Sequence, residues 1–320
     1  MSLELKKRLL FIKFMSRRMV DRILIDKMKL KIPNRKKIFG IPVYDYETQQ
    51  QKIVELLEED RPICIMRPGN AEYVSAWMRD EAKFFGTERY KKQLMYRNLD
   101  ENEELYEKWA NQFNQDMSEA DAVVLLGLRD RMEEYLCEAY WHPKELFNLY
   151  HLEYSPMSLN APYDSWVYSL KGKRVLIVSL FADTMQKQLP HLDDIWGEKN
   201  PIRDVKFVFQ KSVWFKFGSP SNEFSTWFEA LEHLDQQIAA KEFDVAIVSA
   251  GPFSMPLCAN IKRRGGKAIQ YGGSLQLLFG IKGNRWENMP VSQFFNEYWV
   301  RPSAEETPAD AIGHENACYW

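Results

Sequence analysis

The run Asp244-Val-Ala-Ile-Val-Ser-Ala250 decides the fold class, because it is apolar at successive positions and leads directly into the turn Gly251-Pro-Phe-Ser-Met-Pro256. A strand that is apolar on both faces is covered on both faces, as in a parallel sheet with helices on either side. Glycine followed by serine and proline then predicts a turn that opens a helix. This strand-turn-helix unit indicates an α/β protein.

Similar units recur along the chain. Further strands are predicted at residues 63–67, 122–127, 174–180, 205–210 and 267–271. Helical periodicity predicts helices at residues 3–30, 46–59, 101–117 and 225–241, and others starting near residues 70 and 130. We therefore predict a Rossmann-like α/β domain, with a mostly parallel sheet and helices on both faces, over residues 46–320. An N-terminal helical extension over residues 1–45 precedes it.

The charge is distributed unevenly. The net charge of the 320 residues is −2, but residues 1–37 hold thirteen Lys and Arg against three acids. A basic amphipathic helix here can lie on an anionic membrane surface through residues 1–31. The alternative is a helix that packs on the protein body and shows its charges to water.

The remaining composition indicates a location inside the cell. No run of eighteen apolar residues predicts a membrane span, and the N-terminus lacks the pattern of a secretory signal. Of the four cysteines, three have apolar neighbours, which is typical of buried free thiols in a reducing compartment. We expect a cytoplasmic protein, peripheral on the inner face of the membrane if the N-terminal helix binds there. Nucleic acid is not expected as a partner.

Ligands of an open parallel sheet bind beyond the carboxyl ends of its strands. The first predicted strand is followed by Arg67-Pro-Gly-Asn-Ala-Glu72. Gly69 permits close approach of the backbone to a ligand, and Arg67 can bind a diphosphate through two hydrogen bonds. Asn70 and Glu72 can reach one ligand or metal from the same turn. Alternatively, Asn70 only caps the helix, Arg67 is an ion-pair partner and Glu72 is an ordinary acid of the first turn.

Two glycine turns follow the last two predicted strands. Gly251 precedes Ser254, which is a candidate helix cap, and Gly272-Gly273 opens a helix that contains Gln276. Backbone amides in such turns suit phosphate oxygens. A connection between a strand and a helix also needs glycine for structural reasons alone. Together with the turn at Gly69, these residues predict a nucleotide- or phosphate-binding cleft.

Other charged residues complete the predicted site. Lys282 and Arg285 can add positive charge to the cleft. Asp183, after the third predicted strand, can act as a base or accept a hydrogen bond from a substrate hydroxyl, although a helix N-terminal cap is the favoured explanation of its position. The sequence contains neither the GxGxxG pattern of dinucleotide-binding proteins nor the GxxxxGK[ST] pattern of a P-loop.

These residues also carry a family resemblance. The stretch from Asp244 to Trp286, with Arg301-Pro-Ser-Ala-Glu-Glu306 and Cys318-Tyr-Trp320, resembles bacterial polysaccharide-biosynthesis proteins related to the GT-D fold glycosyltransferases. Residues 67–72 and 170–184 agree with it, so the resemblance spans roughly residues 60–320. Its most specific part is the run GGSLQLLFGIKG at residues 272–283.

The resemblance implies transfer of a sugar from a nucleotide-diphosphate sugar, commonly UDP-linked, to a cell-surface polysaccharide or another glycan or lipid-linked acceptor. It also implies Mn²⁺ or Mg²⁺ held by an Asp-x-Glu motif in a context like Arg-x-Gly-Asp-x-Glu. Arg67 and Glu72 match that pattern, but Asn70 stands in place of the Asp. A neutral amide is a poorer ligand for a hard cation, which weakens the expectation of metal dependence. The alternatives are a catalytically decayed nucleotide-sugar or glycan-binding module of an assembly complex, and another Rossmann-like enzyme acting on a phosphorylated metabolite.

Overall fold

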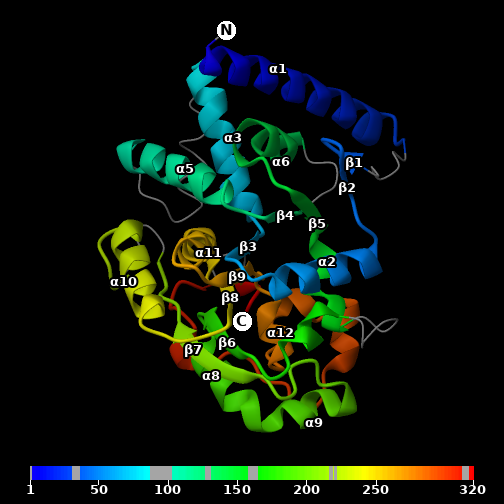
Figure 1. Cartoon of the computed structure of the whole chain (residues 1–320), viewed down its shortest axis with the longest axis vertical. Coiled ribbons are helices and arrows are strands. Elements are labelled where there is room, and N and C mark those ends of the chain that lie inside the picture. The colour runs from blue at the N-terminus through cyan, green and yellow to red at the C-terminus, as the bar shows by residue number, and fades with distance from the viewer. Residues whose placement is uncertain are drawn as a thin grey trace.

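The computed structural model describes residues 2–30, 37–86, 103–126, 131–157, 165–215, 219, 222–311 and 317–320. Within these residues, seven parallel strands form one sheet in the order β5-β4-β3-β9-β8-β6-β7 (Figure 1). The strands are β3 (Ile63–Met66), β4 (Ala122–Leu125), β5 (Glu145–Asn148), β6 (Arg174–Ser179), β7 (Lys206–Lys211), β8 (Val245–Ser249) and β9 (Lys267–Gln270). The predicted α/β class with a parallel sheet is confirmed.

Two hydrophobic cores lie on opposite faces of the sheet, because successive side chains of a strand point to opposite faces. In β6, Leu176 and Val178 belong to the first core, whereas Val175 and Ile177 belong to the second. The first core is covered by α1 (Leu3–Arg22), α3 (Asn70–Phe85), α5 (Glu103–Met117), α6 (Arg131–Leu136), α10 (Trp227–Ala239) and α11 (Ser254–Arg263). The second is covered by α2 (Tyr46–Glu58), α7 (Leu149–Glu153), α8 (Ala182–Gln188), α9 (Leu192–Trp196) and α12 (Leu275–Leu278).

The N-terminal helix α1 lies at one end of the molecule, across α3 and α6, and α9 lies at the other end (Figure 1). A short π-helix, Ile23–Lys27, extends α1, so the helical segment ends three residues before the predicted boundary. The antiparallel pair β1 (Lys37–Ile38) and β2 (Ile41–Pro42) and the edge strand β5 were not predicted. The other six strands of the main sheet fall where the sequence predicts them, within one or two residues.

Three predicted helix caps are wrong, those at Asn70, Ser254 and Asp183. Helix α8 has Phe181 as its N-cap, and Asp183 lies within its first turn. Helix α3 has Gly69 as its N-cap, and Asn70 is already its first helical residue. Helix α11 follows a 3-10 turn, Gly251–Phe253, with Phe253 as the N-cap. The Ser254 hydroxyl instead accepts a hydrogen bond from the Ala250 amide (2.8 Å), so it stabilises the turn that precedes the helix.

Candidate functional site

The candidate site lies at the carboxyl edge of the sheet between β3 and β9. These strands are neighbours, but the helices that follow them pack on opposite faces, α3 on the first core and α12 on the second. In open α/β sheets, ligands commonly bind at such a reversal, beyond the carboxyl ends of the strands. The turns are joined there: the Arg67 amide donates to Gln270 Oε1 (3.0 Å), and the Ser249 hydroxyl donates to the Gly272 carbonyl (2.7 Å). The turns after β3, β8 and β9 therefore share one rim.

A buried ion pair occupies the centre of this rim. Arg67 Nε lies 2.8 Å from Glu153 Oε1, and the two side chains are 20% and 4% exposed. The Ser274 hydroxyl donates to Glu153 Oε2 (2.5 Å), and the Tyr271 hydroxyl donates to the Glu153 carbonyl (2.6 Å). Burial raises the pKa of Glu153, while Arg67 and Ser274 act in the opposite direction. Glu153 is thus fixed by Arg67 after β3 and by Tyr271 and Ser274 in the turn after β9.

The glycine pair after β9 is packed against the protein's own side chains. Gly272 has a φ of +102°, and a Cβ there would lie 2.4 Å from Glu153 Oε1. A Cβ on Gly273 would lie 2.2 Å from Cε1 of Tyr319. Glycine is required at both positions because Glu153 and Tyr319 pack where a Cβ would lie. These two positions do not present the open phosphate cradle that the sequence predicts. Gly251, by contrast, is exposed at a φ of +55° with no atom within 4 Å of a Cβ position.

Glu72 folds back over the start of its own helix. A Cβ on Gly69 would lie 2.0 Å from Glu72 Oε2, so only glycine leaves room for the carboxylate there. A negative charge is favourable at the N-terminus of a helix. Burial lowers the pKa of Arg67, but the charges of Glu153, Tyr319 and Glu72 together raise it above its ordinary value. Arg67 therefore remains a cation between two carboxylates.

A second arginine brings positive charge to the surface of the site. Arg285 Nη1 donates to the Tyr319 hydroxyl (2.9 Å), and its guanidinium lies 4.4 Å from the centre of the Tyr319 ring. The Arg285 amide donates to the Cys318 carbonyl (2.9 Å). The exposed Arg285 guanidinium also influences the pKa of Arg67 and of Glu153. The two arginines thus belong to one electrostatic cluster.

The remaining predicted residues have other surroundings. Asp183 is 52% exposed, with Oδ2 2.5 Å from Lys211 Nζ, and its amide donates to Glu306 Oε1 (2.9 Å). It follows β6, which is separated from β9 by β8. The side-chain amide of Gln276 donates to the Tyr319 backbone carbonyl (3.0 Å), so Gln276 helps to fix the last residues of the chain. The Lys282 amide donates to the Val300 carbonyl (2.8 Å). The described contacts therefore do not bring Asp183 to the arginine cluster, and its role as a base remains a prediction.

The residues described around Glu72 do not fit a protein-held divalent cation. Within the described ranges, no group of three or more His, Cys, Asp or Glu side chains is arranged to hold a metal ion. Asn70 is exposed and neutral, and the charge of Arg67 interacts with Glu72. Hard cations require several oxygen ligands. The described residues therefore do not form a divalent-cation site at this position.

Sequence reasoning missed Glu153 as a site residue. Glu153 ends the short helix α7, which follows β5 directly. The strand β5 reads ELFN and is buried only at its two central positions, so its pattern gives no clear strand signal. A prediction of β5 was needed to place Glu153 at the carboxyl edge of the sheet.

Comparisons with known proteins do not identify a family. No protein-family model matches the sequence, and searches of curated proteins and of solved structures gave no match.

Proposed function

We propose that this protein is a glycosyltransferase that moves a sugar from a nucleotide-diphosphate sugar, with a uridine nucleotide, to a cell-surface polysaccharide or glycan precursor. The observation that supports it is the cluster of Arg67 and Arg285 with Glu72, Glu153 and Tyr319 at the rim between β3 and β9. The resemblance to GT-D fold proteins supplies the sugar donor, since the cluster alone indicates only an anionic ligand.

The cluster suits the charge changes of sugar transfer. As the acceptor oxygen bonds to the anomeric carbon, the bond from that carbon to the diphosphate oxygen breaks, and the diphosphate leaves with the bonding electrons. Arg285 and Arg67 would stabilise the developing charge of the leaving group. The acceptor hydroxyl proton would pass to a carboxylate, for which Glu72 lies next to the arginines and Asp183 lies beyond β8.

Binding of the donor tests this proposal first. Arg285→Gln should weaken binding of UDP-sugars about ten-fold or more, because hydrogen bonds to charged groups contribute about 1.5–3 kcal/mol. Arg203→Gln is the matched control, since Arg203 is exposed and pairs with Asp193 of α9 (3.0 Å) and not with a member of the arginine cluster. Calorimetry with a panel of nucleotide sugars, with and without Mn²⁺, measures both. Absence of binding to every donor in both conditions would contradict the proposal.

A second candidate function is binding without transfer, which the mutual pairing of Arg67 and Glu153 and the neutral Asn70 favour. Turnover separates the two functions. A transferase should lose at least a hundred-fold in rate in Glu72→Gln and still bind UDP. A decayed enzyme should show no transfer in the wild type but gain metal-dependent transfer in Asn70→Asp. Full turnover in Glu72→Gln would remove Glu72 from the assigned chemistry.

A further inference from the structure

Helix α1 is anchored to the body by one face. Phe11 and Phe14 are fully buried, and the Phe11 ring stacks on Trp77 with 4.1 Å between centroids. Phe11 also meets the edge of Tyr135 at 5.1 Å. This anchoring fixes the direction of every other side chain of the helix, because successive residues are rotated by about 100°.

The opposite face of α1 is apolar but is not covered by the body. At about 100° per residue, six apolar side chains fall within an arc of about 100° that points away from Phe11 and Phe14. We call this set the outer stripe: Leu5, Leu9, Ile12, Met19, Val20 and Ile23, which are between 37% and 60% exposed. Single exposed apolar residues are ordinary on protein surfaces, whereas a continuous stripe marks an interaction site.

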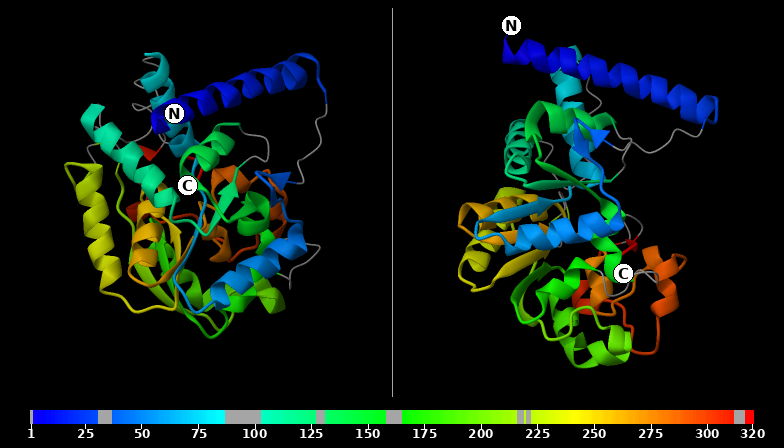
Figure 2. Two further views of the ribbon diagram at one scale, coloured as in Figure 1. Left: turned by 45° about the horizontal axis from the view of Figure 1, so that its top comes forward. Right: turned by 45° about the vertical axis from the view of Figure 1, so that its right-hand side comes forward.

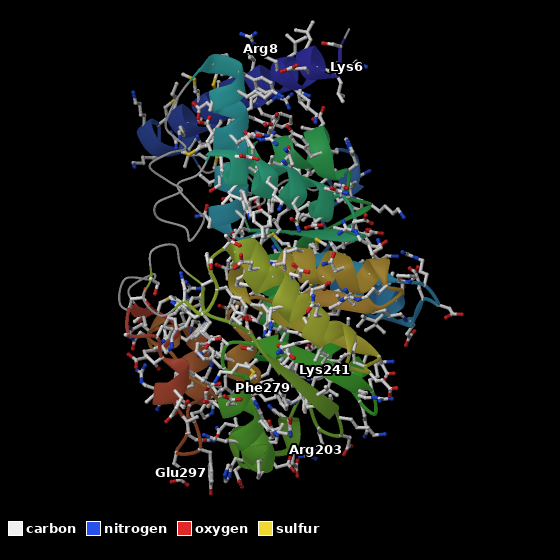
Figure 3. All side chains as sticks on the ribbon, turned by 90° about the vertical axis from the view of Figure 1, so that its left-hand side faces the viewer. Lys6, Arg8, Arg203, Lys241, Phe279 and Glu297 are labelled. Carbon is white, nitrogen blue, oxygen red and sulfur yellow. The ribbon has the colours of Figure 1, made fainter. Side chains whose placement is uncertain are left out.

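Basic side chains flank the outer stripe on both sides. The same rotation places Lys6, Lys13 and Arg17 along one flank and Arg8 along the other, and Lys13 also pairs with Glu138 of the body (3.4 Å). Figure 3 shows Lys6 and Arg8 extending from α1 at the extreme end of the molecule.

The acids of α1, in contrast, point toward the body. Glu4 pairs with Lys83 of α3 (3.5 Å), and Asp21 pairs with Arg131 of α6 (2.6 Å). These pairs neutralise acidic charge on the inner side of the helix. Positive charge therefore dominates the outer side of α1. The rest of the protein is acidic, since residues 38–320 hold thirty Lys and Arg against forty-two acids.

We propose that the outer stripe of α1 docks this protein on an anionic lipid bilayer, with the helix lying in the plane of the surface. Apolar side chains would enter the boundary between head groups and acyl chains, while the flanking cations contact lipid phosphates. The right-hand view of Figure 2 shows α1 along the outer boundary of the molecule. No helix of the described residues is long and apolar enough to cross a membrane. The docking does not depend on the proposed sugar transfer.

Vesicle co-sedimentation of the full chain tests the docking. Wild type should bind vesicles that contain phosphatidylglycerol and should bind pure phosphatidylcholine weakly. Binding should also fall at high salt, because the Debye length shrinks from about 10 Å at 0.1 M to about 3 Å at 1 M. The triple variant Leu5→Gln, Leu9→Gln, Ile12→Gln should partition onto vesicles about 100-fold less than wild type, because three apolar side chains no longer gain free energy from burial in the bilayer. The matching Leu5→Met, Leu9→Met, Ile12→Met variant should bind as wild type does.

A charge series separates the basic flanks from nonspecific attraction. Lys6→Gln with Arg17→Gln should weaken partitioning about 25-fold, since each cation near an anionic surface contributes about five-fold. Lys199→Gln with Lys206→Gln removes two exposed lysines far from α1 and should change partitioning little. Thermal unfolding by circular dichroism confirms that each variant is folded.

Three results would overturn the docking. Equal binding to neutral and anionic vesicles is one, and unchanged binding of the folded glutamine triple variant is another. The third is a stable dimer in sedimentation velocity that the same triple variant dissociates, because the outer stripe would then bind a second copy of this chain.

Discussion

Glu153 and Arg67 form the most deeply buried ion pair of the candidate site, and each has further partners. Glu153 is additionally held by Ser274, and Arg67 lies near Glu72. Removing one member of a buried pair is costly, because the other charge then stays buried without compensation. The same pair is thus a structural element of the rim and a part of its charge.

Arg67→Met should destabilise the protein by about 3 kcal/mol at pH 8, the usual cost of leaving one buried charge unpaired. Burial already raises the pKa of Glu153, and loss of Arg67 would raise it further. A carboxyl whose folded pKa exceeds its unfolded pKa loses stability as pH rises between the two values. The cost should therefore be smaller at pH 5. Urea unfolding at both pH values measures it.

The control for this prediction is Arg174→Met, whose partner Glu242 is 86% exposed. Exposed pairs contribute about 0–1 kcal/mol, so this variant should stay near wild type at both pH values. A cost for Arg67→Met that is independent of pH would show that Glu153 does not take up a proton when its partner is lost.

At the scale of single elements, success of the sequence analysis followed the strength of the local pattern. Strands β6 and β8 are apolar at successive positions and were predicted almost to the residue. β5 is an edge strand with a partly exposed residue at each end, and its pairing with β4 depends on partners distant in sequence. The contacts of Glu153 with Arg67 and with the Gly272 turn are also long-range, so no local spacing could reveal them.

The junction of α1 with α6 contains a titrating carboxyl. Glu134 Oε2 lies 3.0 Å from Arg131 Nη1, and Arg131 Nε lies 2.6 Å from Asp21 Oδ2. Burial raises the pKa of Glu134 to about 7, although Arg131 and Arg17 lower it. Between about pH 4.5 and pH 7, the folded protein therefore holds a proton that the unfolded chain has lost. Stability should fall as pH rises through this interval.

Glu134→Gln should remove that pH dependence. Between pH 5 and pH 8, the free energy of unfolding of wild type should fall by about 1–2 kcal/mol more than that of the variant. This amount is already reduced for solvent screening. Thermal unfolding of both proteins at four pH values in this range measures the difference. Burial also raises the pKa of Asp116 to about 6, but Asp116 is present in both proteins, so its contribution to the pH dependence should cancel in the difference. If the free energy of unfolding of Glu134→Gln changed with pH in parallel with wild type, the assignment of the pH dependence to Glu134 would be contradicted.

At the scale of the whole molecule, the last residues of the chain connect two parts of the carboxyl edge. Near β6, the Glu306 carboxylate accepts hydrogen bonds from the Asp183 amide (2.9 Å) and from the amide and hydroxyl of Thr184. Trp320 Nε1 donates to the Glu306 carbonyl (3.0 Å). Tyr319 then covers Gly273 beside β9. The closing Tyr319-Trp320 pair thus packs on the body and links the start of α8 to the arginine cluster.

This linkage predicts an effect at a distance. Glu306→Gln should destabilise the protein by about 2 kcal/mol, because hydrogen bonds to a buried charge are lost at the start of α8. It should also weaken UDP binding about ten-fold, because loosening residue 306 from α8 would displace the carbonyl that Trp320 Nε1 contacts, and with it Tyr319, which accepts a hydrogen bond from Arg285. Glu305→Gln is the matched control: Glu305 is the exposed neighbour of Glu306, and its replacement should change neither quantity. Urea unfolding and calorimetry with UDP measure the two effects. A loss of stability with unchanged affinity would mean that Arg285 keeps its position without the side-chain contacts of Glu306.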